Sequence, residues 1–325
     1  MFKVAILSRS PALEKQEVLT TYTMPHGEII AGLRAAQASI SPKYFYDQQG
    51  SALFERITAL PEYYPTRTEG AIMQMHGQDI KACIAAAATV IELGAGNCEK
   101  ARVLCSLVQP RCFVAIDISG DFLHQAVNGL RNAFPALDIR AVVADIFDQV
   151  PLPPDLPSGQ RLVFYPGSSI GNFDPEMALG LLQRIRGLLA NQGALLIGVD
   201  LIKDAAILNA ACNDAAGATA AFNLNALTHI NRLIGSDFNL DDWRHHAFFN
   251  AAQSRIEMHL QANRDLRVSW IGGERQFRQG ERIHTENSYK YSVPGFAALL
   301  ERAGFRRPQP WSDPRQWFAV FLAEI

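Results

Sequence analysis

The amino-acid sequence predicts an α/β fold, in which a Rossmann-like parallel sheet carries a second, α+β lobe. From Thr89 onward, short apolar runs rich in β-type residues alternate with patterns of helical spacing, which is typical of successive βαβ units. After Asp200 the alternation stops for roughly 85 residues, which is too long for a loop within a compact domain. We therefore expect a nucleotide-binding core that is interrupted by an inserted lobe.

Five short apolar runs predict the strands of the sheet. They cover residues 89–93, 112–116, 139–144, 162–165 and 194–199. A residue type suited to a ligand-facing loop stands at or just after the end of each run, namely Gly94, Asp117, Asp145, Gly167 and Asp200. Open α/β sheets bind ligands at the carboxyl ends of their strands, so we expect the site along this edge.

Helix signals fill the intervals between the runs. Asp174, Pro175 and Glu176 offer an N-cap, a proline at the first helical position and an acid in the first turn, and apolar residues follow at helical spacing. Gly193 is expected to stop this helix before the fifth strand. A helix over residues 294–303 and a strand over 317–322 are expected to complete the sheet.

These patterns divide the chain into four parts. Residues 1–80 precede the first strand and are expected to pack with the inserted lobe, and residues 81–200 form the core. The inserted lobe, which would bind the substrate, covers residues 201–285. Residues 286–325 return to the core.

The composition points to a small-molecule ligand. Of 325 residues, 48% are apolar, so the chain can bury a large core. The formal net charge is −2 and no five-residue run of one charge sign occurs, which disfavours nucleic acids and membrane surfaces as partners. No stretch reaches the ~18 apolar residues of a membrane helix. We expect a cytoplasmic monomer that binds a neutral or zwitterionic ligand.

Cysteine and histidine usage gives no sign of disulfides or of a metal site. The five cysteines are odd in number and form no CxxC pair, which is typical of a reducing compartment. The adjacent His245 and His246 lack spaced Cys or His partners, so we assign them no role and expect no metal.

The turn after the first strand carries the first chemical signal. Gly94 and Gly96 permit a tight turn that brings backbone N–H groups close to a ligand. The third glycine of a dinucleotide fingerprint is replaced by Glu99, which disfavours NAD. Asp117 can accept hydrogen bonds from both ribose hydroxyls, and Asp145 stands near the expected adenine. These two acids suit any nucleoside cofactor.

Glu92 and the order of the remaining features narrow the choice among nucleoside cofactors. The run from Glu92 to Gly96, the acids after the second and third strands and the C-terminal hairpin together resemble class I methyltransferases, which use S-adenosyl-L-methionine. This resemblance implies a class I methyltransferase sheet with S-adenosyl-L-methionine on the turn and on Asp117.

A narrower resemblance covers the chain from about residue 41 to its end. It is carried by YFYDQQGSALFERI (44–57), LPEYYPTRTE (60–69), YPGSSIGNF (165–173), DAAG (214–217), FN (222–223), RIEM (255–258) and TENS (285–288). These segments resemble the histidine Nα-methyltransferase family of ergothioneine biosynthesis, whose members trimethylate the α-amino group of L-histidine to hercynine. The broader family includes fungal enzymes that act on an indole amino acid.

The resemblance implies a role for each matching position. The cofactor would be held by Glu92, Gly94, Gly96, Lys100, Asp117, Asp145 and Ile146. The amine and carboxylate of the amino acid would be held by Tyr46, Tyr63, Gly167 and Asn172, with Tyr46 and Asn172 as the catalytic residues. The imidazole would be held by Met258, Glu286 and Ser288. One position departs, because Cys212 stands where better-known members have a tyrosine that helps to bind the substrate carboxylate.

The residue types agree with these roles, although each has a structural alternative. Glu286 and Ser288 stand two residues apart, so on an extended segment they share a face and could bind the two ring nitrogens. Taken alone, Glu286 is typical of a surface acid, and Asn172 of a turn residue before a helix. Tyr63 and Tyr64 could be interface aromatics between the lobes.

Two other functions stay open at this point. The same chemistry could act on another amino acid such as tryptophan, although Glu286 would then face the carbon edge of an indole without a partner. The chain could also be a non-catalytic protein that binds the cofactor, which the number of polar pocket residues disfavours.

Overall fold

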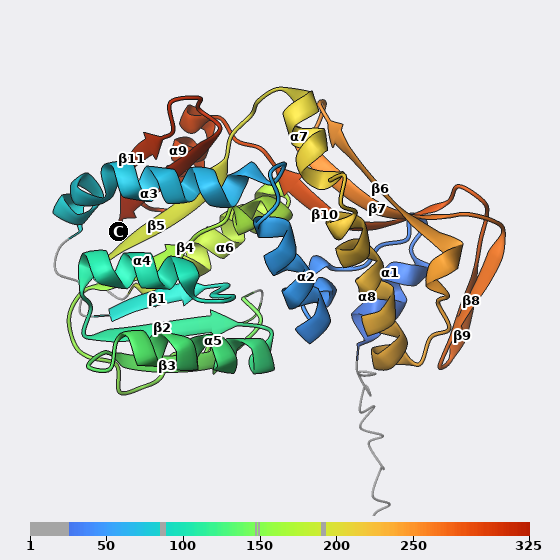
Figure 1. Cartoon of the computed structure of the whole chain (residues 1–325), viewed down its shortest axis with the longest axis horizontal. Coiled ribbons are helices and arrows are strands. Elements are labelled where there is room, and N and C mark those ends of the chain that lie inside the picture. Colours follow the sequence, from blue (N-terminus) through green and yellow to red (C-terminus); the bar gives the residue numbers. More distant parts are fainter. Residues whose placement is uncertain (1–25, 85–88, 147, 149, 190–192) are drawn as a thin grey trace, which may run out of the picture.

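A computed structural model describes residues 26–84, 89–146, 148, 150–189 and 193–325. Figure 1 shows two lobes, with the large sheet in one and most of residues 205–289 in the other. The first 25 residues of the predicted N-terminal segment lie outside the described residues. No helix in the described ranges has both the length and the apolar character that a membrane span requires.

The large lobe is built on a seven-stranded sheet in the order β11-β12-β5-β4-β1-β2-β3. Strands β1 to β5 are parallel, and the C-terminal strand β12 joins β5 in antiparallel orientation. The strands are β1 Thr89–Leu93, β2 Cys112–Asp117, β3 Asp138–Val143, β4 Arg161–Tyr165, β5 Gly193–Asp200, β11 Arg306–Ser312 and β12 Phe318–Glu324. The predicted Rossmann-like sheet is confirmed, and β1 to β5 start and end within one residue of the predicted limits.

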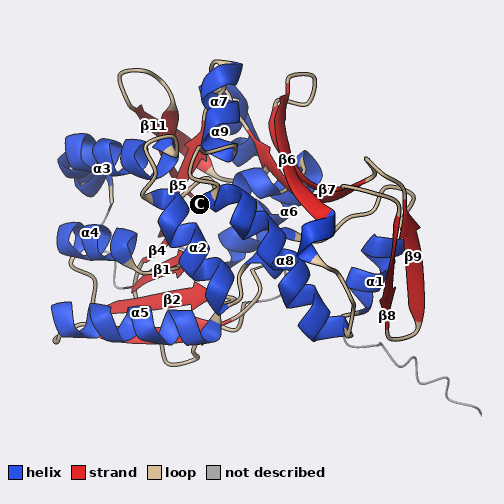
Figure 2. Ribbon diagram, turned by 45° about the vertical axis from the view of Figure 1, so that its right-hand side comes forward, coloured by secondary structure: helices blue, strands red, loops and turns tan. Residues whose placement is uncertain are grey.

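Helices cover both faces of this sheet (Figure 2). Helices α3, α4 and α5 pack their apolar sides on one face, and α6 and α9 pack on the other. Their bounds are α3 Tyr64–Cys83, α4 Glu99–Val108, α5 Gly120–Ala133, α6 Pro175–Leu188 and α9 Val293–Arg302. As predicted, Asp174 caps α6 by accepting a hydrogen bond from the backbone N–H of Met177 at 2.9 Å.

Gly193 does not stop α6, which ends at Leu188; it is the first residue of β5. An added Cβ at Gly193 would lie 2.3 Å from the carbonyl oxygen of Arg161 on the neighbouring β4. The glycine is therefore needed for close strand pairing rather than for ending the helix.

The second lobe combines helices with two small sheets. A three-stranded antiparallel sheet has the order β10-β7-β6, and β8 and β9 form a separate hairpin. The elements are α7 Ala205–Cys212, α8 Ala218–Ile234, η3 Leu240–Asp242, β6 Trp243–Asn250, β7 Arg255–Ala262, β8 Leu266–Trp270, β9 Gly273–Phe277 and β10 Arg282–Tyr289. The N-terminal elements α1 Gly27–Arg34, η1 Pro42–Phe45 and α2 Gln48–Thr58 join this lobe, where η1 and α2 pack against α8.

The structure moves two of the predicted boundaries. Most of helix α3 packs on the core, because Ile72, Met73 and Ile80 are buried against the large sheet. Its first residue, Tyr64, lies in the apolar cluster of the second lobe. Strand β10 runs through the predicted boundary between residues 285 and 286 and stays paired with β7 up to Tyr289. The sheet of the second lobe therefore continues four residues beyond the predicted limit at 285.

The topology places the site at the carboxyl ends of β1 and β4. The two strands are neighbours, while β2 lies on the other side of β1, so the connections after β1 and after β4 diverge. Such a switch point leaves a crevice at the strand ends, as the sequence predicted.

Candidate active site

The turn after β1 has the conformation that its glycines allow. Gly94 and Gly96 have φ values of +68° and +51°, in the left-handed region that favours glycine. No heavy atom of the described chain outside their immediate neighbours lies within 4 Å of the position that a Cβ would take at either residue. The backbone is therefore open toward the crevice and accessible to a ligand.

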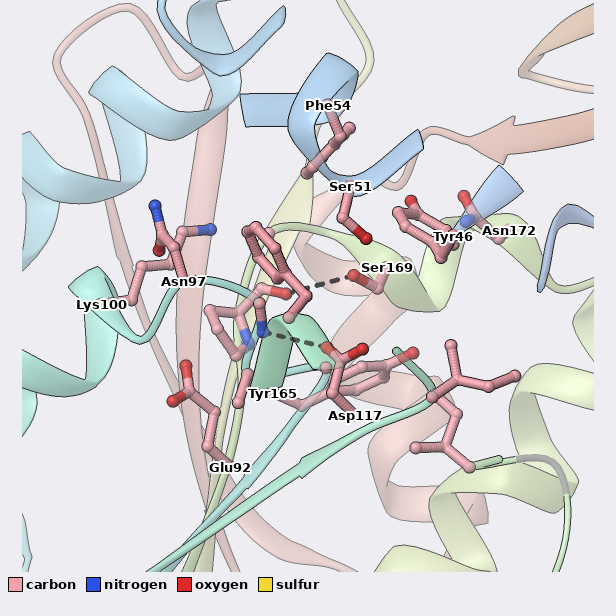
Figure 3. Close-up of a pocket in the computed structure, with 18 of the residues that line it drawn as sticks. Tyr46, Ser51, Phe54, Glu92, Asn97, Lys100, Asp117, Tyr165, Ser169 and Asn172 are labelled. Atoms are coloured by element: carbon pink, nitrogen blue, oxygen red, sulfur yellow. Dashed lines mark hydrogen bonds between the residues drawn. The ribbon is translucent and has the colours of Figure 1, made fainter. Parts of the chain in front are cut away.

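Asp117 stands beside this turn at the end of β2. One of its carboxylate oxygens accepts a hydrogen bond from the backbone N–H of Gly96 at 2.9 Å (Figure 3). The other oxygen accepts from the backbone N–H of Ser119, also at 2.9 Å. Burial raises the pKa of Asp117 above its ordinary value. Each oxygen keeps a second lone pair, so the carboxylate is oriented and can still accept from a pair of hydroxyls.

The crevice forms a cavity that we call the outer cavity, and all of the predicted cofactor residues line it. These are Glu92, Gly94, Gly96, Lys100, Asp117, Asp145 and Ile146. Glu92 is 1% exposed, and its Oε2 atom has no hydrogen-bond partner among the described residues. Burial raises its pKa well above the ordinary range. An acid that faces a cavity without a partner suits a ligand that brings donors, as the amine and hydroxyls of S-adenosylmethionine would.

Sequence reasoning missed a buried acid that contacts two of the residues lining this cavity. Glu69 of α3 is 3% exposed and binds Lys100 Nζ at 2.6 Å. The same carboxylate accepts from the backbone N–H of Gly167 at 2.9 Å. Glu69 thus ties the helix after the cofactor turn to the loop after β4. Glu69 is the last residue of the segment 60–69, which is one of those that carry the family resemblance. That resemblance was the signal by which the residue could have been found.

Lys43 closes the outer cavity from the second lobe. Its Nζ atom lies 3.3 Å from Asp145 and 2.6 Å from Glu28. Asp145 therefore already has a cationic partner on η1, so the N-terminal elements contact the end of the cavity where the adenine is expected.

A second, smaller pocket adjoins the outer cavity. It has a volume of about 100 Å³, against about 240 Å³ for the outer cavity, so the larger space is the one with nucleoside-binding features. This inner pocket is lined by all of the predicted substrate residues, namely Tyr46, Tyr63, Gly167, Asn172, Cys212, Met258, Glu286 and Ser288. Both spaces share the residues that we call the seam: Tyr46, Phe54, Tyr63, Gly167, Ser169 and Asn172.

The seam contains two buried phenols. Tyr46 follows η1 and packs edge-on against Phe54 and Phe222, and Tyr63 precedes α3. Burial raises the pKa of both tyrosines far above neutrality. Both hydroxyls therefore stay protonated and can donate or accept hydrogen bonds, but neither can act as a tyrosinate base. Tyr63 lines both spaces, so it is more than an interface aromatic.

The inner pocket ends at the sheet of the second lobe. Glu286 on β10 pairs in register with Met258 on β7, and both line the pocket together with Ser288. Burial raises the pKa of Glu286 to about 7, although the charge of Lys290 and a hydrogen bond from Asn172 act in the opposite direction. Glu286 is therefore not the surface acid that its position in the sequence alone would suggest.

Cys212, the residue that departs from the family pattern, is the last residue of α7 and lines the inner pocket. Burial raises the pKa of its thiol to about 12, so the group is neutral and a weak donor. The ring nitrogen Nε2 of His245 lies 2.9 Å from the Cys212 carbonyl oxygen, which gives this histidine a structural contact.

A group of buried charges also borders the inner pocket and was not predicted. Asp200 at the end of β5 binds Lys203 at 2.5 Å and Lys290 at 2.8 Å, and it accepts from the hydroxyl of Tyr64 at 2.7 Å. Although burial raises the pKa of Asp200, the two lysines bring it below its ordinary value. The cluster joins the core to the end of β10.

Comparison with known proteins identifies the family. Residues 26–325 match the family described as "Histidine-specific methyltransferase, SAM-dependent". The chain is 40% identical to the histidine N-alpha-methyltransferase of Mycolicibacterium smegmatis, over 91% of this chain and 93% of that protein. It is 30% identical to ergothioneine biosynthesis protein 1 of Neurospora crassa, over 86% of this chain but only 32% of that protein.

A more distant relative acts on an indole compound. The chain is 24% identical to 4-dimethylallyltryptophan N-methyltransferase easF of Claviceps purpurea, over 92% of this chain and 94% of that protein. The family that the sequence motifs predicted is thereby confirmed. This chain belongs to the S-adenosylmethionine-dependent, histidine-specific methyltransferases.

Proposed function

We propose that this protein transfers methyl groups from S-adenosylmethionine to the α-amino nitrogen of L-histidine, to give trimethylhistidine for ergothioneine biosynthesis. The observation that carries this proposal is the order of groups along the two adjoining spaces. The nucleoside-binding features lie in the outer cavity, Tyr46, Tyr63 and Asn172 lie at the seam, and Glu286 lines the inner pocket but not the outer cavity. An amino acid with its amine at the seam would direct its side chain toward Glu286.

The side chains of the site orient the two reactants and do not provide a strong base to deprotonate the amine. S-adenosylmethionine supplies an electrophilic methyl group when it is bound, and Asp117, Glu92 and Lys100 are the residues that would hold it. At the seam the hydroxyl oxygens of Tyr46 and Tyr63 can accept from the N–H groups of the amine, which holds the amine and leaves its lone pair free to attack.

The protonation of the amine is a modest cost. An α-amine with a pKa of about 8 is neutral in roughly one molecule in ten at pH 7, which costs about 1.4 kcal/mol. Holding nucleophile and electrophile in line can contribute about 7–11 kcal/mol, so positioning outweighs deprotonation.

Glu286 favours histidine over tryptophan. A carboxylate in this pocket can accept the N–H of an imidazole, whereas the carbon edge of an indole offers no donor and would leave the carboxylate one hydrogen bond short, at a cost of about 1–3 kcal/mol. The higher identity to the histidine N-alpha-methyltransferase, 40% against 24% for the relative that acts on an indole compound, points the same way.

Isothermal titration of the full chain with S-adenosylmethionine, then with a panel of amino acids, tests the proposal. We expect the cofactor to bind alone and histidine to bind in its presence, with tryptophan at least 10-fold weaker. Tighter binding of another amino acid would transfer the proposal to that substrate. Binding of the cofactor with no amino acid would favour the non-catalytic alternative.

A further inference from the structure

Lys290 has two partners that connect the core to the substrate end of the inner pocket. The residue directly follows β10, and its side chain is 5% exposed. Its Nζ atom lies 2.8 Å from Oδ2 of Asp200 and donates a hydrogen bond to Oγ of Ser288 at 2.6 Å. Asp200 thus holds the ammonium group in place, and the ammonium group in turn restrains the orientation of the Ser288 hydroxyl.

This contact determines which hydrogen bond Ser288 can offer to a ligand. An ammonium group has donors only, so the serine oxygen must accept from it. The hydroxyl hydrogen of Ser288 is therefore not used in this contact. Because Ser288 lines the inner pocket, a ligand bound there can accept a hydrogen bond from it. Ser288 is thereby set as a donor toward whatever occupies the pocket.

Glu286 offers the complementary group on the same strand. Its carboxylate accepts, and it stands two residues before Ser288, so both side chains lie on the same face of β10. A ring that carries one N–H and one unprotonated nitrogen satisfies both groups at once. An imidazolium ring has two N–H donors and would also stand near the cationic Lys290.

We propose that Lys290 is a positioning residue that determines specificity: held by Asp200, it fixes the hydroxyl of Ser288 as a hydrogen-bond donor, so that the pocket selects the neutral imidazole of the substrate. This inference rests on the proposed use of histidine. The ionisable groups that line the inner pocket together with Ser288 are Glu286, Lys290, Asp200, Tyr64, Tyr63, Tyr46 and Cys212.

The chain offers a matched control in Lys203. Its side chain is 4% exposed and binds the same carboxylate of Asp200 at 2.5 Å, so its removal also leaves Asp200 with one lysine. Lys203 donates its other hydrogen bonds to the hydroxyl of Tyr64 and the carbonyl of Leu201, and does not line the inner pocket. Lys203→Met therefore also removes one positive charge from beside Asp200, but it leaves the contact between Lys290 and Ser288 in place.

The test is a double-mutant cycle read by calorimetric titration of histidine into the full chain saturated with S-adenosylhomocysteine, so that no turnover occurs. We expect Lys290→Met to weaken histidine binding about 10-fold, and to change it by less than about 2-fold when Ser288→Ala is already present. Lys203→Met should change it by less than about 2-fold. The same loss in both backgrounds, or an equal loss in Lys203→Met, overturns the inference.

A second measurement uses the unmodified protein and decides the matter if Lys290→Met does not fold. Histidine labelled with ¹⁵N in its ring is bound at about pH 6, where most free imidazole is protonated. One unprotonated ring nitrogen in the NMR spectrum supports the inference, and two protonated nitrogens overturn it. If the unmodified protein does not bind histidine at all, the proposed function fails; if it binds histidine but the variants behave alike, only the role of Lys290 fails.

Discussion

Replacing Glu286 by glutamine should stabilise the protein, and more so at high pH. Burial raises the pKa of this carboxyl from 4.5 to about 7, so the folded state disfavours the ionised form. Glutamine keeps the size and the polar character of the protonated acid but has no charge to bury. The free energy of unfolding of the variant should therefore exceed that of the parent wherever Glu286 would be ionised.

The magnitude follows from the position of the pKa. One pH unit corresponds to about 1.4 kcal/mol, so a pKa near 7 costs the folded protein up to about 3 kcal/mol at pH 8. The cost begins near pH 4.5, where the carboxyl of the unfolded chain ionises, and is complete above about pH 7, where the folded one does. We expect an advantage of less than about 1 kcal/mol at pH 5 and of about 2–3 kcal/mol at pH 8.

Urea denaturation of parent and variant between pH 5 and pH 8, without ligands, measures this difference. The exposed Glu301 provides a control, because Glu301→Gln removes a surface carboxyl at the end of α9. A stability difference between parent and Glu286→Gln that is the same at every pH would refute the reasoning, since it would mean that the carboxyl ionises as easily in the folded chain as in the unfolded one.

Three further substitutions test other parts of the site. Asp117→Ala should weaken S-adenosylmethionine at least 100-fold, because two ribose hydroxyls lose a charged acceptor worth about 1.5–3 kcal/mol each; an unchanged dissociation constant in a calorimetric titration would remove Asp117 from the site. Glu286→Ala should lower kcat/KM for histidine about 10- to 100-fold and leave cofactor affinity intact, so a loss of cofactor binding would contradict its place at the side-chain end. Cys212→Tyr should tighten histidine binding by about 1.5–3 kcal/mol, provided that the ring fits; a KM for histidine that does not fall would indicate a pocket rebuilt around the thiol.

Local patterns predicted the core well because each feature is read within a few residues. The strands β1 to β5 are short apolar runs, and the glycine turn and Asp117 follow directly from where those runs end. Strand order at the switch point then brings these residues together without further information. The N-cap at Asp174 was predictable for the same reason, since capping depends only on neighbouring residues.

Features that depend on which distant part of the chain an element packs against could not be predicted from the sequence. The sequence does not say which sheet the apolar side of α3 covers, and the segment that contains most of this helix was therefore expected to pack with the second lobe, whereas Ile72 and Ile80 pack on the large sheet. Glu69 and Lys290 look like ordinary charged residues until tertiary packing buries them against Lys100 and Asp200. Glu286 was singled out only through the family resemblance, because an acid in an extended segment is most often solvent-exposed.

The most direct test of the account is the product formed from L-histidine and S-adenosylmethionine by the full chain, identified by mass spectrometry with fragmentation that locates each added methyl group. We expect successive additions of up to three methyl groups, all on the α-nitrogen, and no product from tryptophan under the same conditions. Methyl groups on a ring nitrogen, or turnover of another amino acid while histidine stays unchanged, would contradict it.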